Sequence, residues 1–168
     1  MGINGATIVD TGEYTGRSPD DKFFVEESTS KSNLWWGPVN RPVNEKVFNE
    51  LYEKVIGFYN SCDSKTYVFD GYAGAEKKNQ LPLRVIAKRA WQAHFCRNMF
   101  IRPTNDDLLD FQPDFTIINA SDVQDVDYIR HGLNSKTFVI FNLKKKIAII
   151  GGTEYGGEMK KGIFSVLH

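Results

Sequence analysis

Short runs rich in β-branched and aromatic residues recur along the chain between turn-forming residues. Such runs are typical of β-strands, several of them buried. The expected strands cover residues 6–10, 22–26, 66–70, 83–87, 115–119, 137–143 and 146–150. The apolar runs 138–141 and 147–150 flank a short polar segment at a spacing that suits a hairpin, so the sheet should contain antiparallel pairing.

Longer segments with apolar residues at helical spacing separate these strands. Asn44 can cap a helix whose apolar side chains share one face, namely Phe48, Leu51, Tyr52, Val55 and Phe58. A second helix is expected over residues 89–100, where Trp91, Phe95 and Met99 recur every four residues, and a short third one begins at Thr104. The polar stretch 28–33 is interpreted as a loop. Strands interleaved with helices predict an α/β fold with a mixed β-sheet flanked by helices.

Composition limits the classes of partner. The 168 residues, of which 41% are hydrophobic, suit one domain over residues 1–168. Lysine plus arginine equals aspartate plus glutamate at 21 each, so no overall field attracts nucleic acid or a membrane. Two cysteines, no signal peptide and no long apolar stretch favour a cytoplasmic location. Recognition of an anion must therefore be local.

A glycine-rich run over residues 151–162 follows the last expected strand and contains two glycine pairs, Tyr155, Lys160 and Lys161. Glycine leaves backbone amides uncovered, and lysine supplies positive charge, so the run is compatible with an anion site. It is equally compatible with a turn followed by a solvated basic helix. In a helix over about residues 158–167, adjacent side chains point roughly 100° apart, so the two lysines should have different roles.

Arg17 lies between a glycine and a Ser-Pro turn, just ahead of an expected strand. Its planar guanidinium suits bidentate recognition of carboxylate or phosphate. The alternative is a surface ion pair with Glu13, Asp20 or Asp21. Trp35 and Trp36 are compatible with stacking on a ligand, but packing against the sheet is the favoured interpretation.

Several common catalytic motifs are absent from the sequence. The chain has no GxxxxGK[ST] phosphate loop, and no GxSxG, HExxH or CxxC. The three histidines show no metal-binding spacing, and His94, between aromatic residues, is interpreted as a core residue. The chain therefore has no recognisable triphosphate site of its own.

Five motifs in matching order resemble ATP-dependent phosphoenolpyruvate carboxykinase; they span residues 14–19, 91–95, 98–103, 132–135 and 151–162. The similarity runs from about Gly12 to the end and covers only the N-terminal part of that enzyme. In the family, the nucleotide-binding phosphate loop, a metal-binding histidine and aspartate, and a further substrate arginine come later. This chain stops first, midway through an apolar helical pattern, which indicates a piece of a longer protein.

The resemblance implies a reaction and a set of roles. The family converts oxaloacetate and ATP to phosphoenolpyruvate, ADP and CO2, with Mg2+ on the nucleotide and Mn2+ near the substrate. By similarity, Arg17 would hold a substrate carboxylate and the departing CO2, and Tyr155 would contact the substrate. Lys161 would coordinate manganese and approach the transferred phosphoryl group, and Lys160 would add positive charge. His168 matches a position of no known role.

The resulting expectation is a substrate-side N-terminal domain whose C-terminal nucleotide-binding domain is absent. Its partners would be oxaloacetate, phosphoenolpyruvate, CO2 and that missing domain, and the isolated chain would be inactive. Two alternatives stay open at this point: a stand-alone anion-binding module without catalysis, and a scaffold in which the glycine-rich run is only a turn.

Overall fold

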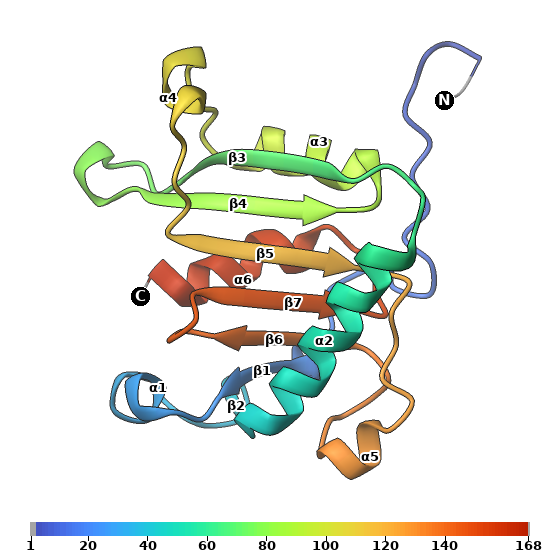
Figure 1. Cartoon of the computed structure of the whole chain (residues 1–168), viewed down its shortest axis with the longest axis vertical. Helices are drawn as coiled ribbons and strands as arrows, with labels where there is room; N and C mark the ends of the chain where they lie inside the picture. Colours follow the sequence, from blue (N-terminus) through green and yellow to red (C-terminus); the bar gives the residue numbers. More distant parts are fainter. Residues whose placement is uncertain (1–2, 168) are drawn as a thin grey trace.

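The computed structural model describes residues 3–167, in which seven strands form one sheet of order β2-β1-β6-β7-β5-β4-β3 (Figure 1). The strands are β1 Lys22–Val25, β2 Arg41–Val43, β3 Tyr67–Ala73, β4 Leu81–Ala87, β5 Phe115–Ala120, β6 Phe138–Asn142 and β7 Ile147–Gly151. The helices are α1 Ser28–Asn33, α2 Glu45–Ser61, α3 Ala90–Met99, α4 Asn105–Leu109, α5 Tyr128–His131 and α6 Gly157–Leu167, with 3-10 turns at Pro19–Asp21 and Lys77–Asn79. The expected mixed sheet flanked by helices is confirmed.

Strand direction decides which loops meet. β4, β5 and β7 are mutually parallel, whereas β6 pairs with β7 in the antiparallel hairpin that the sequence predicts. β1 runs parallel to β6 and therefore opposite to β7. The segment that enters β1 consequently lies at the end of the sheet where β4, β5 and β7 have their carboxyl ends (Figure 1). In α/β sheets, ligands bind preferentially beyond the carboxyl ends of the strands.

Helices cover both faces of the sheet. On one face, α2 buries Phe48, Leu51 and Val55 in a core that it shares with β1, β6 and β7. On the other face, α3 contributes Cys96 and α6 contributes Met159 to a second core. Strands between these two cores need apolar residues on both sides, which explains why β6 is buried along its whole length.

Two of the expected local structures are wrong. Residues 6–10 form no strand: Ile8 and Val9 are exposed, and an apolar run without a neighbouring strand to pair with gains nothing from extension. Residues 28–33 form helix α1 rather than a loop. The Glu27 side chain accepts hydrogen bonds from the Thr29 and Ser30 amides, and this capping box stabilises a helix that has no apolar face.

The predicted α3 exists, but its buried face is displaced from the expected one. Gln92 and Cys96 are fully buried, Trp91 and Phe95 are only half-buried, and Met99 is exposed. The interpretation of His94 as a core residue is wrong, because this side chain faces outward from α3 and is exposed.

Trp35 and Trp36 differ in their surroundings, so packing against the sheet, the favoured interpretation, is confirmed for only one of them. Trp36 packs against the core on the α3 and α6 face, as the favoured interpretation predicts, whereas Trp35 is 81% exposed. Strand β2 and the short helix α5 were not expected from the sequence. None of the helices in residues 3–167 combines the length and the apolar composition that a membrane span requires.

The two cysteines should differ sharply in reactivity. A hydrogen bond with the Ser64 hydroxyl lowers the pKa of the accessible Cys62 thiol, whereas burial raises the pKa of Cys96 to about 12. Because the thiolate is the reactive species, Ellman's reagent at pH 8 should modify one thiol per native chain and two in denaturant. Equal modification rates for both cysteines in the native chain would contradict the packing of α3.

Candidate active site

Close packing explains several glycines in the run from Gly151 to Gly162. A Cβ atom on Gly151 would lie 2.3 Å from the Phe138 ring, and Gly152 has a φ of 74°, in the left-handed region. A Cβ on Gly156 would lie 3.1 Å from the Trp91 ring of α3. These glycines therefore let the chain turn tightly from β7 into α6, against α3.

Helix α3 also holds the polar side of this turn. Arg89 Nη2 lies 2.7 Å from Asp122 Oδ1 and 3.0 Å from Glu154 Oε1, which joins the loops after β5 and β7. The buried Gln92 donates through Nε2 to the Glu154 carbonyl at 3.3 Å. Glu154 is thus held through both its side chain and its backbone, and Tyr155, the next residue, starts from a fixed position.

The segment that contains Arg17 is attached to the start of α6. The Ser18 amide donates to Glu158 Oε1 at 2.6 Å, and Arg17 Nε lies 3.7 Å from Glu158 Oε2. Glu158 is buried, with 2% of its surface exposed. Arg17 therefore pairs with Glu158. The alternative of a surface ion pair with Glu13, Asp20 or Asp21 is wrong.

Asp21 fixes the same segment from the other side. Its carboxylate is buried and accepts hydrogen bonds from Asn134 Nδ2 at 3.0 Å, from Ser135 Oγ at 2.9 Å and from the Ser18 hydroxyl. This contact gives a structural role to the motif at residues 132–135. The Arg17 segment is thus held between the loop before β6 and helix α6.

Lys22 completes a cluster of charged side chains with Arg17, Asp21 and Glu158. Its Nζ donates to Asn40 Oδ1 and to Ser165 Oγ of α6, each at 3.2 Å. Burial and the nearby Arg17 charge lower the pKa of Lys22, while Glu158 acts in the opposite direction. Two cations and two carboxylates therefore share one partly buried cluster, in which each charge has opposite charges nearby.

Helical periodicity places Lys161 on the same side of α6 as Glu158. Glu158 and Ser165 of α6 both face the segment around β1, because Glu158 contacts Ser18 and Ser165 contacts Lys22. Lys161 follows Glu158 by three residues and precedes Ser165 by four, so it lies on the same side of the helix. Its side chain is exposed, and Nζ lies 5.4 Å from the Phe164 ring centre.

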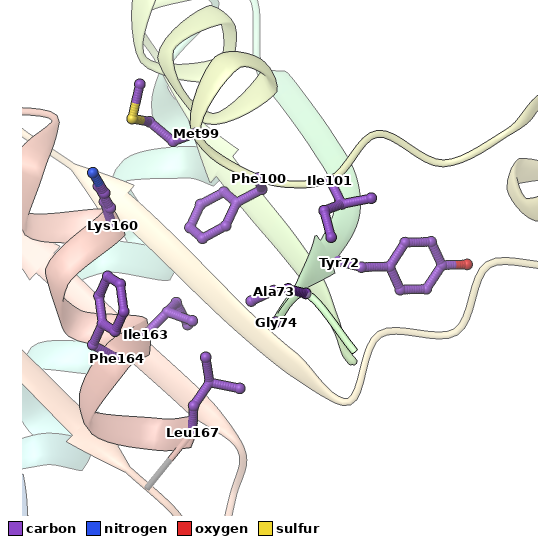
Figure 2. A pocket seen from close by; sticks show the side chains of 11 residues that line it. Tyr72, Ala73, Gly74, Met99, Phe100, Ile101, Lys160, Ile163, Phe164 and Leu167 are labelled. Carbon is purple, nitrogen blue, oxygen red and sulfur yellow. The ribbon is translucent and has the colours of Figure 1, made fainter. Parts of the chain in front are cut away.

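Tyr155 and Lys160 occupy different surroundings. Tyr155 is half-buried, and its ring lies over the first turn of α6, where a Cβ on Gly157 would come within 2.4 Å of it. Lys160 lines a groove of about 330 Å³ between α6, the end of α3 and the end of β3, opposite Met99 and Phe100 (Figure 2). The groove beside Lys160 is mainly apolar, and Phe164, on which Lys161 Nζ lies, also lines it.

The described residues do not by themselves form a metal site. Within residues 3–167, no group of three or more histidine, cysteine, aspartate or glutamate side chains is placed to hold an ion. The position of His168 lies outside the described residues.

Comparison with known proteins now decides the family. The family model described as phosphoenolpyruvate carboxykinase matches residues 1–168. The chain belongs to the phosphoenolpyruvate carboxykinase family. It is 59% identical over 165 residues to the phosphoenolpyruvate carboxykinase (ATP) of Leptospira biflexa serovar Patoc, and 48% identical over 165 residues to that of Campylobacter lari. Each alignment covers 98% of this chain but only 31% of the carboxykinase that it matches.

Sequence reasoning proposed Arg17, Tyr155, Lys160 and Lys161 as site residues, considered Asp21 only as a surface partner of Arg17, and gave no role to Glu158. Glu158 stands inside the glycine-rich run, at the second position of α6, where an acidic residue also favours the helix dipole. That position explains a glutamate without any contact to Arg17. The pairing became visible only when the strand order brought the two segments together.

Proposed function

We propose that this segment forms the substrate-side wall of the active site in an ATP-dependent phosphoenolpyruvate carboxykinase. The reaction is oxaloacetate plus ATP to phosphoenolpyruvate, ADP and CO2, in gluconeogenesis or in the reverse carboxylation. The supporting observation is the contact between the Arg17 segment and Glu158 at the start of α6, which the strand directions allow. Lys161 lies on the same side of α6 as Glu158. In this proposal the enzyme works in the cytoplasm, without nucleic acid or membrane partners.

The residues would divide the work by position. Arg17 can pair through its guanidinium with a substrate carboxylate, which in oxaloacetate includes the group that leaves as CO2. The Tyr155 hydroxyl can donate a hydrogen bond to the substrate from the turn before α6. Lys161 supplies positive charge where an enolate oxygen and the transferred phosphoryl group carry negative charge, and Lys160 adds charge from the neighbouring side of α6.

The binding sites for the nucleotide and the metals would include residues from other parts of the carboxykinase. The sequence contains no phosphate loop for ATP and Mg2+, so in this proposal both are bound by parts of the carboxykinase outside these 168 residues. Lys161 would contribute one ligand to Mn2+, which supplies Lewis-acid charge when it is bound.

The direct test compares two lengths of the protein. The 168-residue chain is expected to show no phosphoenolpyruvate formation from oxaloacetate and ATP. Its sequence contains no phosphate loop, and residues 3–167 hold no group of three or more histidine, cysteine, aspartate or glutamate side chains placed around an ion. A longer protein that contains this segment and continues into a phosphate loop is expected to turn over. Phosphoenolpyruvate release can be followed in a coupled assay with Mg2+ and Mn2+ present. Turnover by the short chain in proportion to its concentration, or none by the long protein, would contradict the proposal.

A further inference from the structure

Glu158 contacts both the backbone and the side chain of the Arg17 segment. One carboxylate oxygen accepts the Ser18 amide at 2.6 Å, and the other lies 3.7 Å from Arg17 Nε. Burial of this carboxyl group raises its pKa, and the Ser18 amide and the Arg17 charge act against that rise. A buried carboxylate is costly unless it is paired, so Arg17 stabilises the ionised form of Glu158 together with the Ser18 amide and the nearby Lys22 charge.

We propose that Glu158 is a positioning residue that orients the Arg17 guanidinium for an incoming carboxylate. The planar guanidinium has two edges that can each meet a carboxylate. Glu158 faces the Nε side of Arg17, so the outer edge formed by the two Nη atoms stays available for a ligand. The Arg17 side chain is 31% exposed, which leaves this edge access to solvent.

The other nearby carboxylate is already committed elsewhere. Asp21 accepts hydrogen bonds from Asn134, Ser135 and the Ser18 hydroxyl. Within residues 3–167, Glu158 is the salt-bridge partner of Arg17. Without the Glu158 charge, Arg17 would be an arginine on an irregular segment, free to populate several rotamers. The orientation of Arg17 therefore depends on Glu158, which is carried by the same helix as Lys161.

The orientation can be measured without any ligand. In the 168-residue chain, we expect the Arg17 Nε–Hε group to be as rigid as the neighbouring backbone in a {1H}-15N NOE experiment. Glu158→Gln keeps an oxygen for the Ser18 amide but removes the charge, so the Arg17 NOE should fall while the Ser18 amide stays ordered. Glu26→Gln removes an exposed carboxylate that pairs with Lys31 and should leave Arg17 unchanged. A mobile Arg17 in the unaltered chain, or an equally rigid one in folded Glu158→Gln, would overturn the proposal.

A pH titration of the unaltered chain covers the case in which Glu158→Gln does not fold. Arg17, Asp21 and Lys22 are the charged groups around Glu158. As the pH falls and Glu158 takes up a proton, the Arg17 Nε resonance should shift together with the Glu158 carboxyl carbon and not with that of Asp21. If Arg17 Nε follows Asp21 or does not titrate, Glu158 does not position it.

The effect of Glu158→Gln on catalysis rests on the proposed function, and it is measured separately from the mobility of Arg17. In the longer carboxykinase, Glu158→Gln should lower kcat/KM for oxaloacetate by roughly 10- to 100-fold, because misplacing a substrate-positioning group costs about that much. A normal kcat/KM together with a mobile Arg17 would contradict the role proposed for Arg17 in catalysis. A rigid Arg17 in the variant would contradict the positioning by Glu158.

Discussion

Replacing Arg17 by glutamine in a carboxykinase that contains this segment should lower kcat/KM for oxaloacetate on the order of 10²–10³-fold, the range measured for removal of one charge-stabilising group. Glutamine cannot carry the positive charge, and it leaves the buried Glu158 without its partner. Steady-state kinetics with saturating ATP and metals measures the loss. Arg17→Lys keeps the charge but not the fork, so its kcat/KM should fall between those of the unaltered enzyme and Arg17→Gln.

Arg130→Gln is the matched control for this prediction. Arg130 is an exposed arginine of α5, and its ion-pair partners Glu50 and Asp127 do not belong to the cluster of Arg17, Asp21, Lys22 and Glu158. Surface ion pairs contribute little to stability, so this variant should have nearly normal kinetics. Equal losses for the two arginines would mean that the assay reports a general effect of charge. Near-normal kinetics for Arg17→Gln would contradict the proposal that Arg17 binds the substrate.

Gly162→Ala should destabilise the fold by about 1–3 kcal/mol, the usual cost of overpacking a core. A Cβ atom at this position of α6 would lie 2.3 Å from the Phe141 ring. That ring cannot easily move, because it is fully buried and stacked between Phe24 and Phe115, with ring centres 5.1 and 6.4 Å away. In a domain of this size, each kcal/mol lowers Tm by roughly 2–4 °C, which thermal denaturation followed by circular dichroism can resolve.

Gly57→Ala makes the same change of residue type, but it should raise the stability of the fold instead of lowering it. Gly57 lies within α2, and a Cβ there meets no atom within 4 Å. Alanine should therefore stabilise the chain by about 0.5–1 kcal/mol through its higher helix propensity. If both variants are stabilised, α6 does not pack on Phe141 as described. Loss of this packing would also displace Lys161, so Gly162→Ala should weaken activity in the longer protein.

The sequence patterns predicted those elements whose apolar residues are also buried. The runs that became β5, β6 and β7 and the helical face of α2 are of this kind. The run at residues 6–10 has the same composition as a strand but is exposed, so its composition was misleading. Helix α1 was missed for the converse reason, since capping by Glu27 and not an apolar face stabilises it.

The site was predictable only as separate segments. Arg17 and the glycine-rich run each suggested anion binding from residue type and order. Their contact depends on Ser18 and Glu158, which are 140 residues apart in the sequence and meet because β1 opposes β7 across β6. Glu158 itself carries no signal beyond that of an acidic residue in the first turn of a helix. A partner of this kind requires the topology, which local patterns do not contain.

Titration of the 15N-labelled chain with oxalate, a compact dicarboxylate, tests most directly whether the Arg17 segment and the start of α6 form one anion-facing wall. We expect the largest shifts together at the Arg17 Nε–Hε group and at the amides of Tyr155 to Lys161, and their loss in Arg17→Gln. Shifts scattered over surface lysines, or shifts that persist in Arg17→Gln, would contradict the account. No shift at either segment would leave the glycine-rich run as a turn between β7 and α6.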